Sequence, residues 1–182
     1  KDKPAKAMVA IHGWKGNRYS MVPLITSINI STLDWYLLEG PYPVPNIDDS
    51  FSWSYEKSKN NWEEDEPRLL LQNFFKVLFK KYSSKDIYIL GFSQGGLICI
   101  DFALFLDKPM GGFFSIAGFT RYPKVVIPRY HPCQICTPII ISHGKQDDIV
   151  PVNASKSIYN PFRGIMLLKY KRRIGFQSLK FS

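Results

Sequence analysis

The stretch that most constrains the fold is YILGFSQGGL, residues 88–97, in which an apolar run leads through Gly-x-Ser-x-Gly into a helix-forming segment. A strand that turns directly into a helix sets the serine at a sharp corner, with its hydroxyl above the end of a sheet. The flanking glycines let neighbouring backbone pass where a β-carbon would clash. We therefore expect Ser93 to be a nucleophile. The alternative is a tight packing turn in which the serine is incidental.

Apolar runs typical of strands alternate with helix-forming segments along the chain. The clearest helix is expected over residues 61–82, where acids stand at the start, lysines at the end and apolar residues recur at helical spacing. Further helices are expected at 19–29, 94–106 and 153–159, and strands at 7–13, 34–40, 86–92, 111–119, 138–144 and 164–170. Continuous apolar strands indicate a parallel sheet covered on both faces. The pattern predicts one α/β domain over residues 1–182, a doubly wound, mostly parallel sheet with helices on both faces.

The net charge is +9, from 24 Lys and Arg against 15 Asp and Glu. Residues 163–182 carry six basic residues and no acid. These basic residues alternate with core-type residues, which favours a solvated strand edge over a nucleic-acid surface. The apolar runs are too short or too interrupted to span a bilayer, so no integral membrane segment is expected.

Three cysteines are present, an odd number that fits a reducing compartment and a cytoplasmic protein. Cys99 lies on the apolar face of a predicted helix and is expected in the core. His131, Cys133 and Cys136 form His-x-Cys-x-x-Cys, but no second cluster would complete a metal site. We expect no metal and no cofactor.

Two further motifs supply what an activated serine requires. In AIHGWKG, residues 10–16, a loop follows the first predicted strand, and Trp14 can offer one backbone N–H to an oxyanion while Gln94, after the serine, offers the other. His12 is then expected to shape that loop through side-chain hydrogen bonds. In ISHGKQDDIVP, residues 141–151, Asp147 or Asp148 follows a strand and can orient a base. Asp148 could equally cap a turn.

Taken together, HGWKG, GFSQGG and HGKQDDIVP resemble the phospholipase/carboxylesterase group of α/β-hydrolases, which includes acyl-protein thioesterases. The proline-rich loop PYPVP…SFSWSY is similar to that group as well, and the resemblance covers about residues 7–151. It implies Ser93 as nucleophile, Asp147 as triad acid, and Trp14 and Gln94 as oxyanion donors. His143 matches a position that supports the acid loop. The implied substrates are small-molecule or lipid acyl esters or thioesters, cleaved through an acyl-enzyme. Loops 41–55 and 119–131, both rich in aromatics, are expected to line the acyl pocket.

The sequence departs from the family at the base. The family's histidine follows the last strand, where this chain has Gly175 and Phe176, and the helix that normally comes next is missing. Losing the base of a serine triad costs on the order of 10⁶ in turnover. Four interpretations follow: a C-terminally shortened, impaired hydrolase; an inactive homologue that binds acyl ligands or a protein; a hydrolase whose base is now His131; or a dinucleotide-binding protein, which lacks its glycine fingerprint here.

Overall fold

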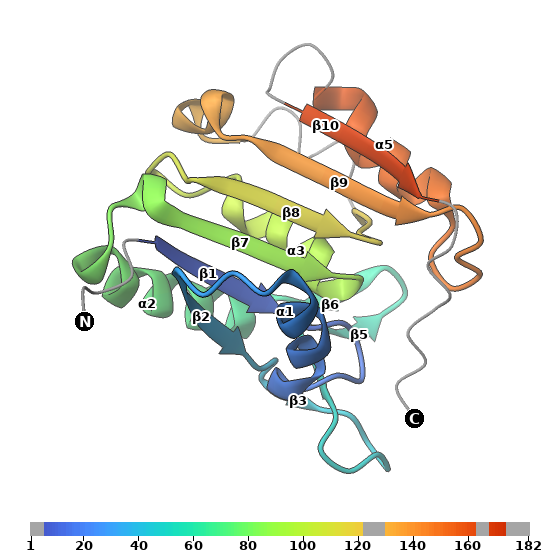
Figure 1. Cartoon of the computed structure of the whole chain (residues 1–182). Helices are drawn as coiled ribbons and strands as arrows, with labels where there is room; N and C mark the ends of the chain where they lie inside the picture. The colour runs from blue at the N-terminus through green and yellow to red at the C-terminus, as the bar shows by residue number, and fades with distance from the viewer. Residues whose placement is uncertain (1–5, 122–129, 163–167, 174–182) are drawn as a thin grey trace.

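The computed structural model describes residues 6–121, 130–162 and 168–173 (Figure 1). Its centre is a six-stranded sheet in the order β10-β9-β8-β7-β1-β2, and each neighbouring pair is parallel. The strands are β1 Lys6–Ile11, β2 Leu33–Leu38, β7 Ile87–Phe92, β8 Gly112–Ile116, β9 Ile139–Gly144 and β10 Leu168–Arg173. The predicted parallel α/β sheet is confirmed.

Helices connect these strands and cover both faces of the sheet, as predicted. The helices are α1 Val22–Ile28, α2 Asp65–Lys81, α3 Gln94–Ala103 and α5 Val152–Phe162, with 3₁₀ turns η1 Arg18–Met21, η2 Ser84–Asp86 and η4 Pro132–Cys136. Figure 1 shows α1 in front of the sheet and α2 and α3 behind it. α1 joins β1 to β2 and α3 joins β7 to β8, and both of these strand pairs are parallel neighbours in the sheet.

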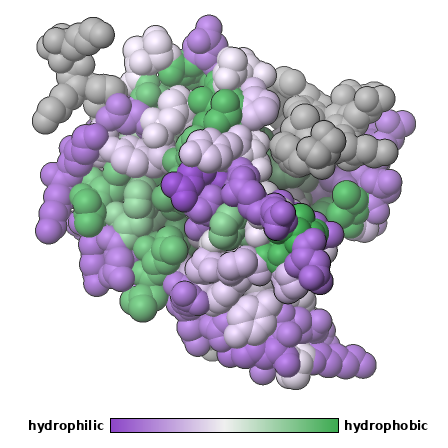
Figure 2. Space-filling view, turned by 90° about the horizontal axis from the view of Figure 1, so that it is seen from below, coloured by the Kyte–Doolittle hydropathy of each residue, from purple (hydrophilic) through white to green (hydrophobic). Residues whose placement is uncertain are grey.

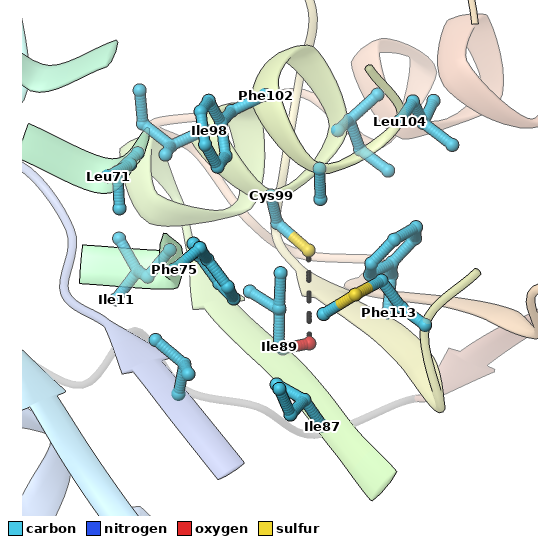
Figure 3. Packing of buried hydrophobic residues seen from close by; sticks show 14 of the residues in the cluster. Ile11, Leu71, Phe75, Ile87, Ile89, Ile98, Cys99, Phe102, Leu104 and Phe113 are labelled. Carbon is cyan, nitrogen blue, oxygen red and sulfur yellow. Dashed lines mark hydrogen bonds between the residues drawn. The ribbon is translucent and has the colours of Figure 1, made fainter. Parts of the chain in front are cut away.

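The two faces of β1 divide the core into two clusters. Ala7, Val9 and Ile11 point toward α2 and α3, whereas Met8 and Ala10 point toward α1, because successive side chains alternate along a strand. On the α2–α3 side the packing is dense (Figure 3), and Cys99 lies within it, almost completely buried, with its thiol toward the carbonyl of Ile89. The prediction that Cys99 is a core residue is confirmed.

The region between β2 and α2 differs from the sequence prediction. The helix expected over 61–82 begins only at Asp65, because Asn61–Glu63 forms strand β6 and pairs with β5, Tyr55–Ser58. Asn60 makes the hairpin turn in the left-handed region, at φ 61°. The loop expected over 41–55 also contains a short ladder between β3 Tyr42–Pro43 and β4 Phe51–Ser52. These hairpins build the wall of the cleft described below.

The strand expected at 164–170 is found as β10, shifted toward the C-terminus, and residues 164–167 of that prediction lie outside the described residues. On the face seen in Figure 2, apolar side chains form separate groups bordered by hydrophilic ones. Among the described residues, no helix combines the length and apolar character needed to cross a bilayer.

Candidate active site

Ser93 occupies the corner between β7 and α3. Its backbone has φ 52° and ψ −113°, a conformation that non-glycine residues rarely adopt and that costs about 1–3 kcal/mol. Two backbone hydrogen bonds hold this geometry: the Ser93 N–H donates to the carbonyl of Ile116 at 2.8 Å, and the Ser93 carbonyl accepts from Leu97 at 3.1 Å. Strain of this kind collects at functional sites, so the turn points to Ser93 as a functional residue.

The glycines around Ser93 are required by close backbone contacts. A β-carbon on Gly91 would lie 2.1 Å from the carbonyl oxygen of Gly95, and one on Gly95 would lie 2.1 Å from that of Ile11. Gly13 approaches the serine itself, since a β-carbon there would lie 3.3 Å from that of Ser93. The loop after β1 therefore packs directly against the serine corner.

Trp14 and Gln94 both line the cleft that contains Ser93. Gln94 is the first residue of α3, where backbone N–H groups have no acceptor within the helix. Within the described part of the chain, neither the Trp14 nor the Gln94 backbone N–H has a hydrogen-bond acceptor. An oxyanion site requires two backbone N–H donors without another acceptor, and these two N–H groups are the candidates for it.

His12 is buried and fixes the loop after β1. Its Nε2 accepts a hydrogen bond from the Gly40 N–H at 3.0 Å, so Nδ1 carries the proton and donates to the Gly13 carbonyl at 2.7 Å. Burial lowers the pKa of His12 and keeps the ring neutral. Trp53, fully buried, donates from Nε1 to the His12 carbonyl at 3.1 Å. The predicted loop-shaping role of His12 is confirmed.

The side chain of Gln94 ties the serine corner to the segment after β4. Its Oε1 accepts from the Trp53 backbone N–H at 3.0 Å, and its Nε2 donates to the hydroxyls of Ser54 at 3.0 Å and Ser52 at 3.1 Å. All of these groups are buried. The expectation for Gln94 concerned its backbone alone; its side chain is a second, structural link that joins residues about 40 positions apart.

Asp147 lies in the loop after β9. Its Oδ1 accepts backbone N–H bonds from Ile149 at 3.1 Å and Val150 at 2.9 Å, and its Oδ2 lies 3.4 Å from Nε2 of His143. His143 is buried, with Nε2 against the Val150 carbonyl at 2.6 Å and Nδ1 against the hydroxyl of Ser155. His143 thus braces the loop that carries Asp147, as the family resemblance implied. Asp148 is exposed.

His131 lies at the far end of α3 from Ser93. Its backbone N–H donates to the Leu104 carbonyl at 2.8 Å, and its Nδ1 contacts the Cys133 thiol at 3.1 Å. Leu104 and Ser93 are eleven residues apart, which at about 1.5 Å per residue is ~16.5 Å along the helix. The interpretation in which His131 has become the base is therefore wrong.

Phe176, the expected base position, lies outside the described residues. Among the described residues there is no group of three potential metal ligands.

A cleft of about 820 Å³ opens at Ser93. Its walls come from separate parts of the chain and are mostly aromatic or aliphatic; they include Trp14, Tyr42, Pro43, Val44, Tyr55, Trp62, Phe119, Ile149 and Val150. The loop expected over 41–55 contributes as predicted. Of the loop expected over 119–131, Phe119 and Arg121 line the cleft, and residues 122–129 lie outside the described residues.

Arg121 is a half-buried charged residue in this wall. Its guanidinium donates to Glu64 at 2.5 Å and to the Ser54 hydroxyl at 2.8 Å, and its central carbon lies 3.7 Å from the centre of the Trp62 ring. Charge-assisted bonds and stacking together hold β6 and the start of α2 against the segment after β8. Sequence reasoning assigned no role to Arg121, which belongs to no motif, or to Trp53, although Trp53 lies in the stretch SFSWSY that resembles the family.

A family model described as Phospholipase/Carboxylesterase matches residues 43–174, more than half of the chain. The chain belongs to this family. The matched region begins after HGWKG and extends beyond residue 151. Because the matched family is a hydrolase family, the interpretation of the chain as a dinucleotide-binding protein is wrong. Membership is consistent with the serine turn, the loop after β1 and the acid loop meeting around one cleft.

The curated relatives include a probable carboxylesterase of Oryza sativa, 33% identical over 73 residues, and acyl-protein thioesterase 1 of Saccharomyces cerevisiae, 30% identical over 73 residues. Each alignment covers 40% of this chain but only 27% and 32% of the relatives, less than a third of their length. The crystal structure of Arabidopsis thaliana SOBER1 superposes with a TM-score of 0.76 at 19% identity, over 93% of this chain and 89% of that one. This likeness supports the α/β-hydrolase fold.

Proposed function

We propose that the chain is a carboxylesterase or thioesterase of serine-hydrolase type that forms an acyl-enzyme on Ser93 and turns over slowly. The observation that carries the proposal is the strained Ser93 turn at the cleft, which is also lined by Trp14 and Gln94, whose backbone N–H groups have no acceptor among the described residues. Family membership supports the hydrolase class. All three cysteines are unpaired, which supports a reducing, cytoplasmic setting.

The reaction would begin with attack of the Ser93 hydroxyl oxygen on the carbonyl carbon of an ester or thioester. The developing oxyanion would accept hydrogen bonds from the backbone N–H groups of Trp14 and Gln94. Collapse of the tetrahedral intermediate would expel an alcohol or thiol and leave the acyl group on Ser93, and water would then release the acid. Asp147 would stabilise positive charge on a base that takes the serine proton.

No histidine of the chain is available as that base. All three fall within the described residues: His12 and His143 use both ring nitrogens in internal contacts, and His131 lies at the far end of α3. A triad without its base loses about 10⁶ in turnover and retains roughly 10³ over water. Slow acylation, with little multiple turnover, is therefore the expected behaviour.

A fluorophosphonate probe tests the nucleophile. Prolonged incubation should add one probe mass to the wild type at Ser93, detected by intact-mass and peptide mass spectrometry. Ser93→Ala should remain unmodified, whereas Ser83→Ala, an exposed serine on the surface, should react as the wild type does. Equal modification of Ser93→Ala and wild type would refute Ser93 as the nucleophile.

A second candidate function is binding of acyl ligands without turnover, and the engagement of all three histidines elsewhere favours it. Phe176→His separates the two candidates with p-nitrophenyl esters as substrates. Turnover that appears only in this variant, and disappears in Phe176→His combined with Ser93→Ala, would identify the native chain as a disabled hydrolase. Saturable fatty-acid binding with no acylation in either chain would favour the binding function.

A further inference from the structure

The hydroxyl oxygen of Ser54 accepts two hydrogen bonds, so its own hydrogen must be donated to another group. The amide of Gln94 has only one orientation, because its Oε1 accepts the Trp53 backbone N–H, which can only donate. Its Nε2 therefore donates to the Ser54 oxygen at 3.0 Å. Arg121, which also can only donate, gives this oxygen a second hydrogen bond at 2.8 Å. Among the described residues, no acceptor receives the Ser54 O–H.

Arg121 has unused donors beside this hydroxyl. A guanidinium carries five N–H groups, and within the described chain those of Arg121 have two acceptors, Glu64 and Ser54. Trp62 covers one face of the guanidinium, so a further acceptor has to approach in its plane. Only 4% of Ser54 and 11% of the Arg121 side chain are exposed. Donors withdrawn from water cost free energy when they lack an acceptor, so an acceptor that enters this part of the cleft is favoured.

These donors lie in the wall of the cleft, close to the serine corner. Ser54 and Arg121 both line the cleft, together with Ser93 and Gln94. Because Gln94 follows Ser93 directly and its side chain donates to Ser54, the length of that side chain and one hydrogen bond separate the Ser54 hydroxyl from the corner. A substrate attacked by Ser93 would therefore present to these donors an atom that is only a few bonds from its carbonyl.

The charges around the donors favour a neutral acceptor over an anion. The positive charge of Arg121 is matched by Glu64, 2.5 Å away, and Glu56 also lines the cleft. A ligand carboxylate at this position would be repelled by both acids, because like charges raise each other's free energy. An ether, keto or amide oxygen can accept from the Ser54 hydroxyl and from Arg121 without adding negative charge.

We propose that Ser54 and Arg121 form a polar subsite of the cleft, which binds a neutral oxygen of the substrate a few bonds from the scissile carbonyl. The proposal rests on the proposed acyl-enzyme function and narrows its substrates to oxygen-bearing acyl esters or thioesters. Two parts of a substrate can carry this oxygen: the acyl chain, as in an oxygen-substituted fatty acyl group, and the leaving group, as in a thiol that contains an amide.

The first arm of the test places the oxygen in the acyl chain. Intact-mass spectrometry measures the rate of Ser93 acylation by p-nitrophenyl octanoate analogues in which an ether oxygen replaces one methylene at successive positions, each rate divided by that of uncatalysed hydrolysis. We expect one isomer to react about fivefold faster than the others, the size of one neutral hydrogen bond. Ser54→Ala should lose this preference, whereas Ser50→Ala, which removes a buried hydroxyl outside the cleft lining, should retain it.

The second arm places the oxygen in the leaving group. The octanoyl thioester of N-acetylcysteamine, which contains an amide carbonyl, is compared with S-pentyl thiooctanoate, which has the same length and no such oxygen. A rate ratio that falls about fivefold in Ser54→Ala but not in Ser50→Ala assigns the oxygen to the leaving group. A preferred ether isomer in the first arm assigns it to the acyl chain.

Melting temperatures of the variants are measured first. If Ser54→Ala does not fold, the ether isomers decide the question with the wild type alone, because they share one composition and differ only in the place of the oxygen. Equal rates for all isomers, with no advantage of the amide thioester, would show that the subsite holds only water and would overturn the proposal. A carboxylate that reacts faster than the ether at the preferred position would also overturn it.

The outcome for the proposed function is read separately. Acylation of Ser93 at equal rates by all isomers removes the subsite and leaves the acyl-enzyme function standing. Absence of acylation by every ester removes the subsite as well, and fluorophosphonate labelling of Ser93 then decides whether the nucleophile stands.

Discussion

The side chain of Asp101 is buried, and among the described residues only one of its two carboxyl oxygens has a hydrogen-bond partner. One oxygen accepts from the Thr120 hydroxyl at 3.3 Å, and among the described residues the other has no hydrogen-bond partner. Burial, reinforced by the nearby negative charge of Glu64, raises the pKa of Asp101 to about 7 from its ordinary value of 3.8. The residue lies behind the segment that carries Phe119 and Arg121, so its ionisation acts close to the cleft wall.

We predict that Asp101 makes stability fall as pH rises from about 4 to about 7. In this window the folded chain holds a proton that the unfolded chain has released, so the folded state is favoured at low pH and loses this advantage as pH passes its pKa. About three pKa units correspond to at most about 4 kcal/mol. Urea denaturation of wild type and Asp101→Asn at several pH values measures the difference, with exposed Asp107→Asn as control. Parallel pH profiles of wild type and Asp101→Asn would contradict the prediction.

At the scale of single residues, the sequence predicted correctly those features that depend only on residues close by in the chain. The corner at Ser93 follows from Gly91, Ser93 and Gly95 within one turn, and the structure gives a backbone reason for each glycine. Histidine placement was only partly predictable. His12 and His143 were expected in bracing roles from their motifs, whereas the position of His131 depended on where its loop packs against α3.

At the scale of elements, the link between α3 and the segment after β4 is the contact on which the site depends. Gln94 contributes a buried amide that satisfies one backbone N–H and two serine hydroxyls. Trp53 continues the link to the loop after β1 through the His12 carbonyl. The serine corner, the first loop and one cleft wall are therefore held as one unit.

Replacing Gln94 by leucine should destabilise the fold by about 2–4 kcal/mol. The buried Trp53 N–H would be left unsatisfied, at about 1–3 kcal/mol, and the hydroxyls of Ser52 and Ser54 would each lose one of their hydrogen bonds. Gln72→Leu, on the exposed side of α2, should change stability by less than about 0.5 kcal/mol. Chemical denaturation followed by circular dichroism compares them. Similar midpoints for Gln94→Leu and wild type would show that the network contributes little.

Element boundaries show where sequence patterns were insufficient. Acids and apolar spacing over 61–82 predicted one helix, but Asn61–Glu63 pairs with Tyr55–Ser58 instead. A three-residue strand is stabilised by its partner rather than by its own composition, and the hairpin packs through Trp62 against Arg121, 59 positions away. A prediction based on neighbouring residues does not contain that contact.

At the scale of the whole molecule, the cleft is assembled from several separate stretches of the described chain around the carboxyl ends of parallel strands. Most of its lining is aromatic or aliphatic, which suits an acyl chain. A ligand that touches all of these stretches stabilises only the folded state, in which they lie together.

Saturated fatty acids should therefore raise the melting temperature. At a concentration 100 times the dissociation constant the gain is about 2.7 kcal/mol, or several degrees for a chain of this size. Val44→Asp, which places a charge in the cleft wall, should abolish the shift, whereas Val77→Asp on the exposed side of α2 should not. Differential scanning fluorimetry reports both. An equal shift in Val44→Asp would indicate that the ligand binds elsewhere.

The sequence by itself determined the order of the central-sheet strands and of the helices between them, the parallel sheet and the serine turn, because these depend on periodicity and on glycines within a few residues of one another. Only the tertiary structure decided which groups meet at the cleft. Gln94 with Trp53, Arg121 with Glu64, and the distance of His131 from Ser93 all arise from packing between distant segments. The sequence has a serine turn without a histidine at the position where the family has its base. The tertiary structure shows that His12 and His143 use both ring nitrogens in other contacts and that His131 lies at the far end of α3 from Ser93.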